Sequence, residues 1–98
     1  MALIQVYIND GRQIITVPGT RVPLVYVSAP AKKVIVQAEV ENLYPLTVGG
    51  PNVVHAKVTR QGTVLYASDS VTLEISDLNT VYLDGPYAGE GATFLYMI

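Results

Sequence analysis

Apolar and polar residues alternate with a period of two along much of the chain, which is typical of strands with one buried and one exposed face. The clearest segment is residues 34–40, where one face carries Val34, Val36, Ala38 and Val40. Residues 71–75 alternate in the same way with Thr72 and Glu74 outward, and residues 54–58 place Val54, Ala56 and Val58 opposite His55 and Lys57. No segment has a convincing period of 3.6 residues, so the pattern predicts an all-β fold.

Glycine, proline and small polar residues divide the chain at short intervals and predict its turns. Asn9, Asp10 and Gly11 predict a tight hairpin between strands at residues 4–8 and 13–17. Further turns are expected at residues 18–20, 29–31 (after a strand at 22–27), 49–52, 60–62 and 67–70, with a long glycine loop at 85–91. About eight to ten short strands at this spacing predict a single domain over residues 1–98, an antiparallel, jelly-roll-like β-sandwich.

The last strand, residues 93–98, is apolar on both faces and ends without a polar tail. A strand with one solvent-exposed face carries polar residues on that face and does not have this composition. The strand is therefore either central in the sandwich or packed against a neighbouring subunit, and the pattern leaves both possibilities open.

Composition favours an assembly role. Half of the residues are apolar and 14% are charged, against about 25% charged residues in an average soluble domain. A domain of this size buries only roughly 65% of its extended surface, so we expect the excess apolar surface to contact another protein or a second copy. The expected assembly interface comprises the first and last strands: Leu3, Val6, Ile8, Phe94, Leu95, Tyr96, Met97 and Ile98.

Several classes of function are not supported by the composition. Six Lys and Arg residues are scattered along a chain of net charge −2, whereas phosphate binding needs clustered cations. The absence of cysteine excludes disulfides and thiolate metal sites. The first residues lack the charged region and cleavage site of a secretory signal, and no apolar stretch is long enough to span a membrane. We expect no nucleic-acid partner, no membrane partner and no cofactor.

Candidate catalytic or ligating residues are few, and we expect no enzyme. His55 is the only histidine and lies on the expected outward face of a strand, without a second histidine or cysteine for a metal site. Asp69, Asp77, Asp84 and Glu90 fall in expected turns without the spacing of a calcium loop, and nothing local supports a carboxylate pair of a glycosidase. The seven tyrosines are the best case for a ligand, since Tyr44, Tyr82 and Tyr87 lie near loops and could stack on sugars or hold a partner. Tyr7, Tyr26, Tyr66 and Tyr96 lie within expected strands.

From Lys33 onward the order of features resembles a family of small structural proteins of tailed bacteriophages, the head-decoration or virion-associated proteins. The resemblance covers about the last two-thirds of the chain. It runs through residues 42–50 (Asn-Leu-Tyr-Pro-Leu-Thr-Val-Gly-Gly), Gly62 to Leu65, the turn at 67–70, Asp77-Leu78, the glycine loop and the closing Phe94-Leu95-Tyr96. It consists of turns and strands and contains no catalytic signature.

The resemblance implies a β-sandwich or jelly-roll module located in the virion and assembled in the host cytoplasm. It implies a homo-oligomer, a trimer, that binds a phage major capsid or other virion protein as a capsid decoration or cement protein. The alternative is a receptor- or carbohydrate-binding knob of a fibre or tail. Residues 1–32 lie outside the match and either complete the sandwich or form an arm that reaches a neighbour. The matched turn residues Gly49, Gly50, Pro51 and Asp77 are expected to have structural roles. Gly49 and Gly50 should allow a turn that side chains would block, Pro51 should stiffen its exit, and Asp77 should accept backbone N–H groups in its own turn.

Overall fold

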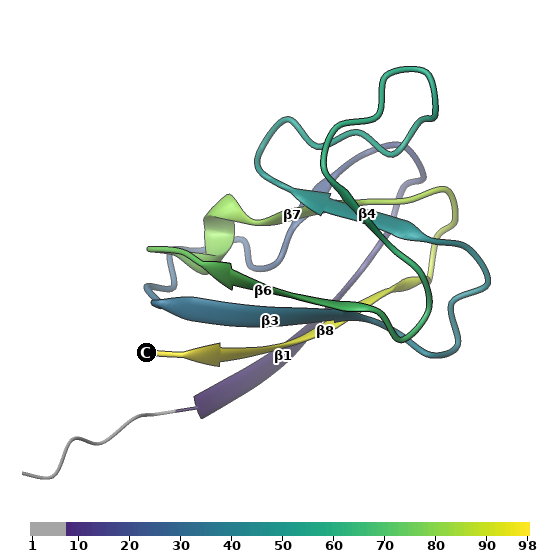
Figure 1. Cartoon of the computed structure of the whole chain (residues 1–98). Helices are drawn as coiled ribbons and strands as arrows, with labels where there is room; N and C mark the ends of the chain where they lie inside the picture. Colours follow the sequence, from purple (N-terminus) through teal and green to yellow (C-terminus); the bar gives the residue numbers. More distant parts are fainter. Residues whose placement is uncertain (1–7) are drawn as a thin grey trace, which may run out of the picture.

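The computed structural model describes residues 8–98 (Figure 1); the expected interface residues Leu3 and Val6 lie outside this range. The described residues form antiparallel strands and one short 3-10 helix, Leu78–Thr80. The strands are β1 (Ile8–Ile14), β2 (Val22–Pro23), β3 (Lys33–Ala38), β4 (Leu46–Gly49), β5 (Thr63–Leu65), β6 (Ser70–Glu74), β7 (Tyr82–Asp84) and β8 (Gly91–Met97).

The strands form two four-stranded sheets with jelly-roll connectivity. The first sheet has the order β1-β8-β3-β6, and the second has the order β2-β7-β4-β5. The chain pairs β4 with β5, β3 with β6, β2 with β7 and β1 with β8, as one long antiparallel ribbon. The ribbon rolls up, because β8 also pairs with β3 and β7 also pairs with β4. This confirms the predicted all-β, jelly-roll-like sandwich.

The core lies between the two sheets and follows the alternation seen in the sequence. Val34, Val36 and Ala38 of β3 are fully buried, and Val36 lies directly opposite Phe94 of β8. The second sheet contributes Leu46, Val48 and Leu83. β8 occupies an interior position between β1 and β3. Its Phe94 face is turned to the core, whereas Leu95 on its other face is 39% exposed.

The predicted hairpin at Asn9, Asp10 and Gly11 is wrong, because β1 runs straight through these residues. Gly11 lies opposite Phe94 in the β1–β8 register. A Cβ atom at Gly11 would overlap the Phe94 ring, with Cζ as its nearest atom, so the aromatic ring covers the glycine. Gly11 therefore serves a close approach between two strands and not a turn.

Four other predicted strands differ from the structure. The strand expected at 22–27 is only Val22–Pro23, and the one expected at 13–17 ends at Ile14. Residues 54–58 form a loop in which Val58 is 96% exposed, and the chain reverses at Ala56 to Thr59 and not at 60–62. Val40 lies beyond β3 and is exposed. Period-two patterns occur in loops as well, where no neighbouring strand fixes their faces.

Other turns are where the sequence predicts them. The Thr20 amide donates to the Val17 carbonyl around Pro18 and Gly19, with Gly19 at a φ of 79°, which proline and glycine favour. Further turns close at Gly50 to Val53 and at Tyr66 to Asp69. Residues 85–90 connect β7 to β8, as expected for the glycine loop.

Candidate functional site: an open sheet face and a tyrosine end

The two sheets differ in what covers their outer faces. The β4–β5 connection folds over the second sheet and buries Thr47 and Val53, and Val53 would touch a Cβ atom at Gly49. Figure 1 shows this connection arching above β4 and β7. No described segment covers the outer face of the first sheet in the same view. The first sheet therefore presents the open face of the sandwich.

Side chains on this open face can be assigned from the register, since residues directly opposite in antiparallel strands project to the same side. Ile35 of β3 lies opposite Leu95 of β8 and Thr72 of β6. Met97 lies opposite Lys33 and Ile8. The open face thus carries an apolar strip, Ile8, Ile35, Leu95 and Met97, with polar residues beside it: Asp10, Arg12, Lys33, Gln37, Thr72, Glu74 and Thr93.

The open face is shallow and amphipathic. A hollow of about 610 Å³ lies over Ile35, Leu95 and Thr93, with Asp10, Arg12 and Gln37 at its margin. Leu95 is 39% exposed and Ile8 is 60% exposed. An apolar centre with a polar rim is the arrangement found at protein interfaces.

The residues expected to form the interface fall in three places. Ile8, Leu95 and Met97 share the open face, and Ile98 is exposed at the end of the same strand pair. Phe94 does not belong to the surface: it is 5% exposed and lies in the central core. Tyr96 is half-buried against the core, with its ring 6.0 Å from that of Phe94. The alternation of β8 between two faces separates residues that are adjacent in the sequence.

An ion pair ties the edge of the open face to the β3–β4 connection. Arg12 donates from Nε and Nη2 to the two carboxylate oxygens of Glu39, at 2.9 and 3.0 Å. The hydrogen bonds to Glu39 raise the pKa of Arg12 above its ordinary value. The bidentate geometry fixes the guanidinium across β8.

His55, Thr47 and Asp84 come together, although nothing in the sequence pattern groups them. The Thr47 hydroxyl lies 2.7 Å from Nδ1 of His55. The Asp84 carboxylate accepts the backbone amides of His55 at 2.8 Å and Gly85 at 2.9 Å. Asp84 binds the His55 backbone, and Thr47 is buried. These three residues therefore hold the β4–β5 connection against the second sheet.

The pKa of His55 lies below its ordinary value. Burial of the ring is the main cause, and Arg60 adds repulsion that Asp84 partly offsets. A neutral imidazole fits its hydrogen bond to the Thr47 hydroxyl. The prediction that His55 lies on the outward face of a strand is wrong, because His55 lies in the β4–β5 connection, which folds over the second sheet.

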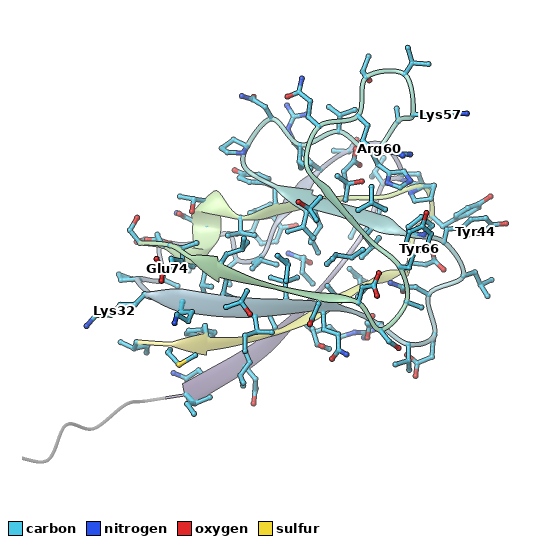
Figure 2. The ribbon with its side chains drawn as sticks, in the orientation of Figure 1. Lys32, Tyr44, Lys57, Arg60, Tyr66 and Glu74 are labelled. Carbon is cyan, nitrogen blue, oxygen red and sulfur yellow. The ribbon has the colours of Figure 1, made fainter. Side chains whose placement is uncertain are left out.

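A second candidate surface lies at the end of the sandwich where the β3–β4, β5–β6 and β7–β8 connections meet. Tyr44 and Tyr87 stack with ring centroids 4.5 Å apart, and each is about half exposed. Tyr66 is exposed, and Figure 2 shows it at the same end as Tyr44. We name this set the tyrosine end: Tyr44, Tyr66 and Tyr87.

A carboxylate lies beside the stacked pair. Glu90 accepts the Leu43 amide through Oε2, while its Oε1 is buried without a hydrogen-bond partner in the described part of the chain. The pKa of Tyr87 is raised, chiefly by hydrogen bonding to Tyr44, with a smaller contribution from Glu90. The sequence pointed to Tyr44 and Tyr87 as loop tyrosines but could not show that they stack.

The turn residues that the family resemblance singles out, Gly49, Gly50, Pro51 and Asp77, have different roles in the structure. Asp77 accepts the amides of Ala29 and Asn79 and the Ser28 hydroxyl, and these bonds hold its pKa below the ordinary value. Pro51 lies in the Gly50–Val53 turn, and Gly49 lies close to Val53. Gly50 is not needed for space, since a Cβ atom there meets nothing within 4 Å. The expectation that both glycines admit a turn that side chains would block is therefore wrong for Gly50.

Residues 8–98 contain no group of three or more His, Cys, Asp and Glu side chains arranged to hold a metal ion. No helix in this part of the chain is long and apolar enough to cross a membrane. The chain matches no protein-family model, no curated protein and no solved structure. A function for this chain must therefore be inferred from the surfaces of its described residues.

Proposed function

We propose that this chain is a non-enzymatic structural protein of a tailed-bacteriophage virion, a decoration or cement module that binds the head surface and stabilises it. The observation that supports this proposal is the open face of the first sheet. Its apolar strip collects Ile8, Leu95 and Met97, three residues that composition alone had assigned to an interface. The partner is a major capsid protein or another virion protein.

The fold agrees with this proposal without deciding it. Jelly rolls include viral capsid and lectin domains, but a fold hosts many functions and the surface must distinguish them. Burial of apolar area contributes about 25 cal/mol per Å². A patch of a few hundred Å² is therefore significant against a net folding stability of about 5–15 kcal/mol.

Replacing Leu95 by Asp should abolish binding to the capsid shell, because it places a charge in the centre of the apolar strip. Met97→Asp should act in the same direction. Binding is measured by co-sedimentation of the purified protein with assembled shells. Val58→Asp is the matched control, since Val58 is almost fully exposed on the connection over the other sheet. If folded Leu95→Asp binds as well as Val58→Asp, the open face is not the attachment surface.

A receptor- or carbohydrate-binding knob is the second candidate function, and the stacked Tyr44 and Tyr87 favour it. Exposed, stacked aromatic rings suit the apolar faces of sugars. This function predicts binding on a broad glycan array that Tyr87→Ala removes. Tyr26→Ala, at an exposed tyrosine of the β2–β3 connection, should keep it. A wild-type protein that retains no glycan would remove this candidate.

A further inference from the structure

β1 offers a long unpaired edge. It pairs with β8 over all of its residues, from Ile8 opposite Met97 to Ile14 opposite Gly91, and it is the last strand on its side of the first sheet. Figure 1 shows β1 along the lower margin of the sheet, with no other described strand beyond it. Gln13 donates from its side chain to the Pro23 carbonyl and accepts the Ile14 amide through Oε1, so one end of the edge, at Ile14, is partly satisfied by a side chain. Edges of this kind are templates for pairing with another strand.

The alternation of the ladder determines which backbone groups face this edge. The Ile15 amide donates to the Glu90 carbonyl at 2.8 Å. In an antiparallel ladder the hydrogen-bonded positions alternate, so the odd-numbered residues of β1 direct their N–H and C=O groups toward β8. Ile8, Asp10, Arg12 and Ile14 therefore direct theirs toward the open edge.

The sequence of β1 is chemically symmetric about Gly11. It reads Ile-Asn-Asp-Gly-Arg-Gln-Ile, so each residue has a complementary residue at the same distance on the other side of the glycine. Isoleucines stand at both ends, amides follow them, and Asp10 and Arg12 flank the centre. The edge is thus complementary to itself when it is read in the opposite direction.

We propose that two copies of this chain associate by antiparallel pairing of their β1 edges about a two-fold axis at Gly11. Asp10 of each copy then lies opposite Arg12 of the other, and Ile8 lies opposite Ile14. Both pairings use residues whose backbone groups face the open edge, which places them at hydrogen-bonded positions of the new ladder. The Ile14 amide donates to Gln13 Oε1 at 3.1 Å in the single copy, so it must exchange this bond for the Ile8 carbonyl of the second copy. The first sheets of the two copies become one continuous sheet.

Charge and apolar contacts both favour this pairing. Opposite charges directly across antiparallel strands stabilise the pair, whereas like charges destabilise it. Arg12 binds Glu39 across β8 through Nε and Nη2, so its positive charge attracts Asp10 of the second copy from the neighbouring position without a hydrogen bond being required. Charged residues on an edge strand often prevent pairing; here their opposite signs and equal distances from Gly11 make them attractive to a second copy.

The proposed pairing of β1 edges determines the symmetry of the dimer and the strength of the association. A two-fold axis through one edge of each copy gives a closed dimer, in place of the trimer expected from the family resemblance. A single strand pair is small compared with the roughly 1,200–2,000 Å² buried in stable complexes. We therefore expect an equilibrium between monomer and dimer that shifts with concentration. The proposal does not depend on the proposed function. The two surfaces share Ile8, but the pairing uses the backbone edge of β1 with Asp10 and Arg12, whereas the apolar strip is centred on Leu95.

Charge reversal tests the pairing directly. Asp10→Lys places an ammonium group opposite Arg12 of the second copy, and Arg12→Glu places a carboxylate opposite Asp10 of the second copy. Each variant alone should therefore be monomeric, because like charges face each other twice in its dimer. A mixture of the two variants should form a heterodimer, because both cross-strand pairs then join a cation to an anion.

Mass is measured by sedimentation equilibrium over a dilution series, and folding of each variant is checked by thermal melting. Glu74→Lys is the control, since it reverses a charge on β6, the opposite edge of the same sheet. It should leave the dimer intact.

The measured masses of the wild type, the variants and their mixture decide between a β1-paired dimer and other states. A wild-type protein that dimerises, loses the dimer in each single variant and regains it in the mixture supports the proposal. A wild type that stays monomeric at the highest soluble concentration, or a mixture that stays monomeric, overturns it. A trimer unaffected by Asp10→Lys also overturns it. Shell binding by Leu95→Asp reports only on the proposed function, so the two proposals fail independently.

Discussion

Replacing Phe94 by Ala should lower the free energy of unfolding by about 3–5 kcal/mol, the usual cost of truncating a buried aromatic residue. Phe94 is 5% exposed and belongs to the central core, and its ring also covers the backbone at Gly11. Removal of the Phe94 ring would therefore remove the contact of β8 both with β1 and with the second sheet. Chemical denaturation with matched fluorescence and circular dichroism measures the effect.

Leu95→Ala is the matched control, because Leu95 is the next residue and projects to the open face. It should cost about 1 kcal/mol or less. Gly11→Ala adds a further test, since its Cβ atom would overlap the Phe94 ring. Gly11→Ala should destabilise the wild type strongly and the Phe94→Ala variant much less, which a double-mutant cycle resolves. Equal costs in both backgrounds would contradict the placement of Phe94 over Gly11.

Replacing Asp84 by Ala should destabilise the fold by about 2–4 kcal/mol, because it leaves buried backbone donors without an acceptor. The Asp84 carboxylate is 3% exposed and accepts the amides of His55 and Gly85. Without it, the β4–β5 connection loses its attachment to β7. Thermal unfolding should show the loss of stability, and hydrogen exchange should show faster exchange at the His55 amide.

Asp84→Asn keeps one carbonyl acceptor and should fall between the wild type and Asp84→Ala. Asp69→Ala is the control, since Asp69 accepts one amide, that of Tyr66, in an exposed turn, and should cost about 1 kcal/mol. An Asp84→Ala variant as stable as Asp69→Ala would show that the carboxylate does not hold the connection in place.

Much of the fold could be predicted from the sequence. The alternation around Val34, Val36 and Ala38 predicted a strand with one buried face, and these side chains are fully buried. The turns at Gly19, Ser68 and the glycine loop were located correctly, because proline, glycine and short polar residues have local backbone preferences. The spacing of strands then predicted an antiparallel sandwich with jelly-roll features.

The candidate surfaces were only partly predictable. Leu95 and Met97 were identified as interface residues from their composition, and they do share the open face with Ile8. Phe94 was assigned to the same interface because a sequence pattern that is apolar on both faces does not state which face is inward. That choice depends on the side on which the second sheet packs, where Leu46, Val48 and Leu83 form the core together with Phe94.

Local patterning was enough to specify the fold class, the faces of the central strands and most of the turns, because period-two alternation and turn preferences act over a few residues. Residues 9–11 extend instead of turning for a long-range reason, since the Phe94 ring that covers Gly11 comes from a strand far along the chain. Long-range packing also places the β4–β5 connection over the second sheet and leaves the first sheet open. These contacts join residues distant in sequence, and local preferences carry no information about them.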